Sequence, residues 1–496
     1  MALFLQIFKK GFVLKRMMLR LLVIISFIYC IPYSTDCQSV DGLTHSEEKL
    51  FEADIHDSLT FTSVRNVNIT GYKRTKLYIV EREVSVHPGD LFTKSKLNRE
   101  LRQTREQLMN TALFVDVVVT KTEIENSQVD ILIDVKERWY VFPVPYFKVV
   151  DRNWNVWIKE HNASLDRVNI GLKVTHNNAT GINDKLNLWI IGGYTQQLSL
   201  NYFRPYFDKK LRFGYNIGFA YARNREVNYA TDYNKLLTVD TSIFNRKYFH
   251  AEGGLSYRKG SKLRMQARLG YTKENFDSSI AKLNPDFLGG GRIKANYVDL
   301  TYATQYYNVD YIPYPLRGWY FDVYALNRMG TKGDLNMLQL GGKFLGTWEV
   351  MNKTWLAFQA AAIIRFPATQ PYYNSRLLGF GDVAMQGLEY YVADGAAGGM
   401  VRATIRRQVL QFTVKRLIKS KTHANIPFRF FLKTYGNLGY VYNKNPGTSF
   451  MNNKLLRTGG VGLDIVTIYD WAIKLDFSFN QFDSGGKLYF HTQSDF

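Results

Sequence analysis

The segment Trp471–Phe496 constrains the fold of this chain more than any other stretch. From Ile473 to Asn480 apolar and polar residues alternate, which is the period of a β-strand with one apolar and one polar face. A turn at Asp483–Gly486 follows, and a second alternating run continues to Phe496. A final strand leaves a free hydrogen-bonding edge, so we predict that it pairs with the first strand of the same sheet and closes a barrel.

The composition agrees with strands that face lipid on one side and water on the other. Aromatic residues make up 15% of the chain, with 33 Tyr and 33 Phe, yet the mean hydropathy is slightly negative. This balance is typical of alternating transmembrane strands. The formal net charge is +21, but the basic residues are dispersed rather than clustered, so we expect lipids and no nucleic acid as partners.

The N-terminus has the layout of a secretory signal. A basic stretch, Lys9–Arg20, precedes an apolar stretch of about eleven residues, Leu21–Ile31, which is too short to span a bilayer comfortably. We predict a signal peptide over residues 1–37 and a polar leader over residues 38–61. No later segment contains about eighteen apolar residues in a row, so any membrane span after export must be formed by strands.

Both cysteines, Cys30 and Cys37, fall within the predicted signal segment. Cleavage after Cys37 leaves a mature chain without a disulfide or a reactive thiol. Lipidation of either cysteine is the alternative. It is less favoured, because Tyr29 and Asp36 stand where a small residue is expected just before a lipidated cysteine.

Residues 62–138 show the pattern of one small α+β domain. The order is a strand, two helices and two strands, with turn residues between them. The predicted elements are a strand over residues 64–69, helices Lys76–Val84 and Lys94–Thr111, and strands Phe114–Thr120 and Val129–Glu137.

We predict that residues 166–496 form a sixteen-stranded antiparallel transmembrane β-barrel, joined to the small domain by a connector over residues 139–165. Two prolines make Val141–Tyr146 a stiff part of that connector. An even number of strands returns the two ends of the barrel to the same side of the membrane. The predicted strands are Arg167–His176, Lys185–Tyr194, Gln196–Phe207, Leu211–Arg223, Leu236–Arg246, Tyr248–Lys259, Lys262–Glu274, Tyr297–Tyr311, Leu316–Met329, Leu335–Val350, Thr354–Phe366, Met400–Phe412, Phe428–Tyr442, Leu455–Tyr469 and the two runs of the closing hairpin.

Short motifs in both regions add a resemblance to a known family. They are Gly71–Thr75, Arg82-Glu83, Pro88–Asp90 and Arg105–Phe114 in the small domain, and Gly192–Gln196, Arg204–Asp208 and Tyr314–Trp319 in the barrel. The chain resembles the BamA/TamA superfamily of outer-membrane assembly factors, also called the bacterial surface antigen family, with a single barrel-proximal POTRA domain. The resemblance covers roughly residues 60–496.

The resemblance implies a location and a set of partners. The location is the outer membrane of a Gram-negative bacterium, with the POTRA domain in the periplasm. POTRA domains of this family bind unfolded client segments or partner subunits, often by adding a strand to a sheet edge. The expected partners are outer-membrane lipids, unfolded outer-membrane or secreted client proteins, and periplasmic or lipoprotein accessory subunits. A POTRA domain that only supports the barrel is the alternative.

The sixth extracellular loop carries the most specific motif of this family. In the family the loop folds back into the lumen, and the arginine of a Val/Leu-Arg-Gly-Tyr/Phe tip bonds to the barrel wall. The matching tip here is Met385-Gln386-Gly387-Leu388, so glutamine replaces the arginine. Gln386 can donate a hydrogen bond but cannot form a bidentate ion pair. We expect a weaker lock, or one in which Arg376 supplies the missing charge.

Two functions follow as hypotheses. The first is an outer-membrane assembly or translocation factor that inserts or exports client proteins through POTRA binding and a lateral barrel seam. The alternative is a non-catalytic structural or accessory subunit of an outer-membrane complex. The first function needs a weakly paired seam between Arg167–His176 and Lys487–Phe496. The residues expected at that seam are Arg167, Asn169, Leu488, Phe490, Thr492 and Phe496.

Nothing in the sequence indicates an enzyme. The eight histidines are scattered, none has the spacing His-Glu-x-x-His, and no Gly-x-Ser-x-Gly turn occurs. His491 lies near Asp476 and Ser478 on the polar face of the closing hairpin, but polar residues are expected inside any such barrel. We therefore predict no catalytic residues, no cofactor and no metal.

Overall fold

The computed structural model describes residues 61–124, 127–149, 165, 168–241, 243–331, 335–381, 383–415, 425–467 and 472–491. All of these residues belong to one compact unit of the chain, Ile55–Phe496. The predicted signal peptide and nearly all of the predicted leader lie outside the described residues. In the part of the chain that is described, no helix is long and apolar enough to cross a membrane.

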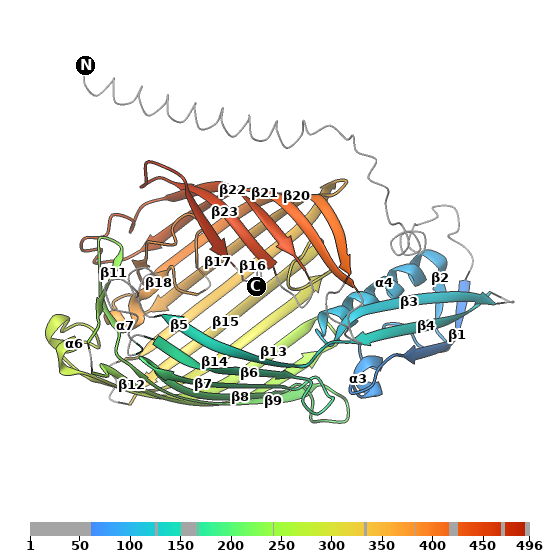
Figure 1. Cartoon of the computed structure of the whole chain (residues 1–496), viewed down its shortest axis with the longest axis horizontal. Coiled ribbons are helices and arrows are strands. Elements are labelled where there is room, and N and C mark those ends of the chain that lie inside the picture. Colours follow the sequence, from blue (N-terminus) through green and yellow to red (C-terminus); the bar gives the residue numbers. More distant parts are fainter. Residues whose placement is uncertain are drawn as a thin grey trace, which may run out of the picture. The chain divides into compact units, whose positions relative to one another are not determined.

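The small N-terminal domain has the predicted α+β fold (Figure 1). Its elements are β1 (Phe61–Thr70), α3 (Leu77–Glu81), β2 (Leu91–Thr93), α4 (Lys94–Asn110), β3 (Phe114–Ile124) and β4 (Gln128–Glu137). The sheet order is β2-β1-β4-β3, with β1 parallel to β4 and the other pairs antiparallel. Leu97, Leu101 and Leu108 lie on one face of α4 and are at most 1% exposed. They anchor the helix in the core of the domain.

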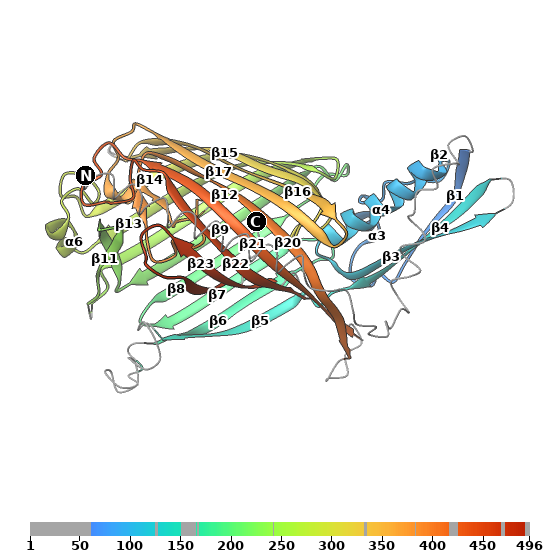
Figure 2. The same cartoon turned by 90° about the horizontal axis from the view of Figure 1, so that it is seen from above.

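The rest of the described chain is dominated by a sixteen-stranded sheet, which confirms the predicted fold class (Figure 1, Figure 2). The strands are β5 (Val141–Val149), β6 (Val168–Asn177), β7 (Lys185–Gly193), β8 (Gln196–Arg204), β9 (Phe213–Asn224), β12 (Arg246–Lys259), β13 (Leu263–Phe276), β14 (Lys294–Val309), β15 (Gly318–Gly330), β16 (Met337–Met351), β17 (Thr354–Phe366), β20 (Ala397–Lys415), β21 (Asn425–Tyr442), β22 (Leu456–Val466), β23 (Ala472–Asn480) and β24 (Lys487–His491). They pair in chain order from β5 to β24, and every neighbouring pair is antiparallel.

The two faces of the sheet differ as the alternation in the sequence predicts. On β23, Phe477 and Phe479 are each 40% exposed on the outer face. Lys474, Asp476 and Ser478 point the other way and are at most 6% exposed. Apolar side chains of β23 therefore face outward and polar side chains face inward, which is the pattern of transmembrane β-strands.

The structure corrects the predicted connector, because Val141–Val149 is the first barrel strand and pairs with β6 over its whole length. Pro143 and Pro145 had indicated a linker. Residues two apart in a strand direct their N–H positions to the same edge, so both prolines fall on one edge of β5. Since the other edge is paired with β6, the missing donors lie on the free edge, where an edge strand tolerates them.

A second correction concerns Leu236–Arg246, which was predicted as a barrel strand. The segment instead contributes β11 (Lys235–Val239), which pairs only with β10 (Val227–Asp232) in a separate two-stranded sheet. The two-residue turn between them has positive φ at Tyr233 and Asn234, the geometry of a tight hairpin. The strand total remains sixteen because β5 replaces the excluded segment.

One end of the barrel contacts the small domain. Arg82 Nε donates to the Leu211 carbonyl oxygen at 2.9 Å, in the turn between β8 and β9. Asn110 Nδ2 donates to the Val309 carbonyl oxygen at 3.2 Å, just before the turn between β14 and β15. Because the strands are antiparallel and consecutive, every second connection lies at this end. The connection from β17 to β20 lies at the opposite end.

Candidate functional site

The connection from β17 to β20, here called loop six, folds against the inner wall of the barrel. It contains α7 (Tyr372–Ser375), β18 (Arg376–Leu378) and β19 (Ala393–Asp394). The loop tip, residues 385–391, follows β18. Met385 and Leu388 of the tip are only 3% and 2% exposed. They belong to one apolar cluster with Ala361, Ile363, Leu377, Leu378, Val383, Ala393, Met400, Val441, Met451 and Leu456.

Gln386, which stands where the sequence resemblance leads us to expect an arginine, bonds to the wall. Its Nε2 atom donates to Asp476 Oδ2 on β23 at 2.9 Å. Its backbone oxygen accepts from Asn437 Nδ2 on β21 at 3.3 Å. The glutamine therefore joins the tip to two strands of the wall without adding a charge.

The backbone conformation and close packing at position 387 explain why a glycine follows Gln386. Its φ is +93°, a conformation that other residues rarely adopt. A Cβ atom there would lie 3.2 Å from Ser478 Cβ and 3.3 Å from Phe479 O. The Gly387 carbonyl oxygen accepts from Asn480 Nδ2 at 2.8 Å. The backbone of the tip thus sits directly on β23.

The positive charge opposite Asp476 comes from the barrel wall. Lys433 Nζ on β21 lies 2.7 Å from Asp464 Oδ1 and 2.8 Å from Asp476 Oδ1. The three side chains are 4%, 2% and 0% exposed. A buried carboxylate needs such a partner to remain charged. Lys433 was not predicted from the sequence. The sequence shows it only as a lysine on the inward face of a predicted strand.

Arg376 does not supply charge at this point of the wall. Its Nη2 atom donates to the Asn228 carbonyl oxygen on β10 at 2.9 Å. Its guanidinium also lies 5.6 Å from the ring centres of Tyr372 and Phe380. The nearer arginine is Arg402 on β20, whose Nη2 atom donates to the Ala384 carbonyl oxygen at 3.1 Å. In this structure Lys433 contacts Asp476 and Arg402 contacts the backbone before the loop tip, whereas Arg376 contacts β10.

The far side of the tip contacts the last described strand. Glu389 Oε1 lies 3.3 Å from His491 Nε2 on β24. The rings of Tyr390 and Tyr489 are 5.6 Å apart. The loop tip therefore contacts β21, β23 and β24, and links loop six to the edge of the sheet.

The turn between β23 and β24 is held by Asp483. This carboxylate accepts from Lys487 Nζ at 2.7 Å, from Asn480 Nδ2 at 2.8 Å and from the Tyr391 hydroxyl at 2.9 Å. The hydrogen bond from Lys487, followed by that from Asn480, lowers the pKa of Asp483 to about 2. The turn and the loop tip are thus joined by a carboxylate that stays ionised.

Three of the six predicted seam residues, Asn169, Leu488 and Phe490, lie among the described residues. Leu488 and Phe490 on β24 are 68% and 62% exposed, on the outer face. Asn169 lies on β6, the second strand, and its Oδ1 atom accepts from the Thr195 backbone at 2.6 Å. The remaining predicted seam residues, Arg167, Thr492 and Phe496, lie outside the described residues. The two end strands of the sheet are β5 and β24, so Arg167–His176 is not its first strand as predicted, and no backbone pair joins β5 to β24 within the described chain.

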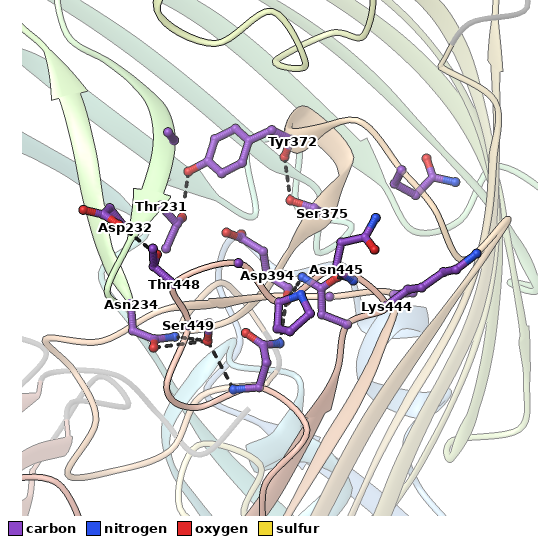
Figure 3. A pocket seen from close by; sticks show the side chains of 18 of the residues that line it. Thr231, Asp232, Asn234, Tyr372, Ser375, Asp394, Lys444, Asn445, Thr448 and Ser449 are labelled. Carbon is purple, nitrogen blue, oxygen red and sulfur yellow. Dashed lines mark hydrogen bonds between the residues drawn. The ribbon is translucent and has the colours of Figure 1, made fainter.

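A polar cavity of about 540 Å³ lies among three connections at the loop-six end of the barrel (Figure 3). The hairpin β10–β11, loop six and the connection from β21 to β22 all line it. Thr448 Oγ1 donates to Asp232 Oδ1 at 2.8 Å, and Asn234 Nδ2 donates to the Val392 carbonyl oxygen at 2.8 Å. These bonds join the three connections to one another. Within the described chain, no cluster of three or more metal-binding side chains occurs.

Two family models match the chain. Residues 62–138 match the POTRA model, described as a surface antigen variable number repeat. Residues 178–380 match the Omp85 superfamily domain. No curated protein shows a significant match to the sequence.

Several solved structures match the chain at low sequence identity and with TM-scores below 0.5. BamA from Haemophilus ducreyi lacking POTRA domains 1–3 is 16% identical, with a TM-score of 0.47 and coverage of 86% of this chain and 83% of that chain. CdiB from Acinetobacter baumannii is 12% identical, with a TM-score of 0.42 and coverage of 87% and 73%. CdiB from Escherichia coli is 9% identical, with a TM-score of 0.47 and coverage of 86% and 75%.

Proposed function

The chain belongs to the Omp85 superfamily and carries one POTRA domain, and on this premise we propose that it inserts or exports client proteins at the seam between β5 and β24. Members of this superfamily mediate outer-membrane protein insertion or secretion, and their POTRA domains are periplasmic. In this proposal the POTRA domain receives an unfolded outer-membrane or secreted client, and the seam passes it toward the membrane.

The single observation that carries the proposal is the composition of the β5 edge. Pro143 and Pro145 remove two N–H donors from the edge that faces β24, because the opposite edge pairs with β6. Each backbone hydrogen bond contributes about 1 kcal/mol net. A seam that lacks two N–H donors can form fewer hydrogen bonds than a strand edge of the same length without proline. A client strand can then compete with β24 for β5.

Loop six also reaches the last described strand, β24 (Lys487–His491), which pairs with β23. The contact between Glu389 and His491 connects loop six directly to β24, the strand that moves in this proposal.

The POTRA domain offers a place for client capture. In its sheet order, β2-β1-β4-β3, β3 is an edge strand of eleven residues. An edge strand can accept an extended segment by main-chain hydrogen bonds, which requires no fixed client sequence. This supports a role in receiving unfolded chains rather than only supporting the barrel.

A structural or accessory role is the alternative, favoured by the buried contacts of the loop tip. Gln386, Asp476 and Lys433 hold loop six against the wall next to the seam. If those contacts never release, the barrel is a closed anchor for the POTRA domain within a larger complex. Neither reading assigns a catalytic residue, cofactor or metal.

Restoring donors on the β5 edge tests the proposal. The variant Pro143→Val/Pro145→Val adds two N–H groups to the seam without changing β24. We expect slower client insertion into proteoliposomes and a higher temperature for loss of the folded, slow-migrating band on gels. Val144→Ile adds bulk to the same strand but no donor, so it serves as the control. An insertion rate equal to that of the unmodified protein contradicts a role for the seam.

A further inference from the structure

A second cavity, of about 370 Å³, lies at the POTRA end of the barrel. Its size falls in the usual range of small-molecule sites. The end of α4, the turn after β14 and residues of β8, β12, β13 and β14 line it. Apolar and aromatic residues form much of its wall, namely Met109, Phe203, Tyr206, Met265, Ala303, Ile312 and Pro313.

The charged side chains that line the cavity are all basic. Lys185, Arg258 and Arg264 line it, and its lining contains no aspartate or glutamate. Arg258 is neutralised from outside the cavity, because its two terminal nitrogens each lie 2.7 Å from a carboxylate oxygen of Glu83. The charge of Arg264 has no such partner among the described residues.

Arg264 packs against an aromatic ring, and one of its N–H donors has no acceptor among the described residues. Its guanidinium carbon lies 4.6 Å from the centre of the Tyr307 ring. Its Nε atom is buried and has no hydrogen-bond partner within the described chain. A buried donor without an acceptor destabilises the fold, and the effect is larger when the group is charged. An anion that enters the cavity would satisfy it.

We propose that this cavity binds a medium-chain fatty carboxylate. The carboxylate pairs with the Arg264 guanidinium, whose fixed fork suits two parallel N–H to oxygen hydrogen bonds. The acyl chain lies along the apolar wall formed by residues such as Phe203 and Ala303. Because Met109 and Asn110 of α4 also line the cavity, the bound molecule bridges the POTRA domain and the barrel. This site does not depend on how clients are inserted.

The test uses the full chain in a nonionic detergent, with decanoate labelled at its carboxyl carbon as the probe. We expect saturable binding, seen as a shift of the carboxyl carbon resonance, and at least tenfold weaker binding by Arg264→Gln. Arg268→Gln is the matched control. Arg268 lies four residues along the same strand face and is 3.9 Å from Glu252, outside the cavity lining. We expect this variant to bind normally.

Two further probes define the ligand. Decanamide has the same chain without the charge, so we expect no saturable binding. An acetylated dipeptide ending in phenylalanine presents a carboxylate on a peptide, and we expect it to bind more weakly than decanoate. Equal binding by both arginine variants means partition into the micelle only and overturns the site. Binding of decanamide, or tighter binding of the dipeptide, overturns the assignment of a fatty carboxylate.

A second variant covers the case in which Arg264→Gln does not fold. Ala303→Phe places a ring in the cavity and leaves the arginines unchanged. Folding is checked for each variant by its heat-dependent gel migration. We expect Ala303→Phe to lose decanoate binding while the folded band persists, and undiminished binding by this variant overturns the proposal.

Discussion

Gln386 donates a 2.9 Å hydrogen bond to Oδ2 of Asp476, a carboxylate that is fully buried in the barrel wall. The opposite oxygen of the same carboxylate lies 2.8 Å from Lys433 Nζ. The two tasks of a single arginine, donation and charge, are thus divided between the loop tip and the wall.

Gln386→Ala removes the hydrogen bond but leaves the charge pair. We expect the free energy of unfolding to fall by about 2 kcal/mol, because a hydrogen bond to a charged group is lost at a buried site. Urea titration in detergent measures it. Gln411→Ala, on an exposed part of β20, is the control. Equal stability of the two variants would show that the tip is not held by this bond.

Lys433→Met leaves two buried carboxylates without their cation. We expect a loss of about 3–5 kcal/mol, since an uncompensated buried charge is strongly destabilising. Adding Gln386→Arg places a guanidinium at Asp476 Oδ2, so the double variant Lys433→Met/Gln386→Arg is expected to regain part of that loss. The same urea titration measures how much stability the double variant regains. If the second change gives no recovery, the two residues do not share the role of one arginine.

Glu83→Gln tests the contact between the POTRA domain and the barrel. Glu83 is 2% exposed and forms a two-pronged ion pair with Arg258 of β12. The change leaves a buried guanidinium without its carboxylate, so we expect about 3 kcal/mol of destabilisation. Faster hydrogen exchange in α3 and in the turn between β12 and β13 is the measurement. Glu81→Gln, at the exposed end of α3, is expected to change neither the stability nor the exchange rates.

Asp483 gives the hairpin β23–β24 a defined pH dependence. Its folded pKa, about 2, lies below the ordinary value of 3.8 because Lys487 and Asn480 bond to the carboxylate. A lowered pKa stabilises the folded state above the ordinary value, and this contribution is lost as pH falls through the folded pKa. We expect hydrogen-exchange protection of the hairpin, corrected for intrinsic rates, to decline between pH values of about 4 and about 2. We expect Asp483→Asn to remove this pH-dependent decline in protection. If the decline persists in that variant, another titrating group causes it.

Much of the fold follows from the sequence because its signals are local. The alternation in β23 and the apolar spacing of Leu97, Leu101 and Leu108 in α4 depend on neighbouring residues alone. β5 was missed because its prolines are typical of a linker, and only its position at a sheet edge makes them compatible with a strand. β11 was misplaced because a short hairpin outside the wall alternates in the same way as a barrel strand.

The site was less predictable because it depends on pairing between distant residues. Met385–Leu388 was located from its motif. Lys433, Asp464 and Asp476 meet only through the register of β21, β22 and β23, which no local pattern reports. The Nε atom of Arg264, which has no hydrogen-bond partner among the described residues, is likewise recognised only once the cavity and its lining are known.

Client insertion as proposed requires movement between β5 and β24, and a disulfide across that seam tests this movement directly. Both natural cysteines lie in the predicted signal segment, so paired cysteines can be introduced into the mature barrel at Phe142, Val144 or Tyr146 and at Leu488 or Phe490. The control disulfide joins Phe477→Cys to Leu488→Cys, which are paired neighbours on β23 and β24. Client insertion into proteoliposomes is measured before and after reduction. We predict that a β5–β24 disulfide stops insertion reversibly in a folded barrel while the control disulfide does not. Full insertion with the β5–β24 seam covalently closed would contradict the account.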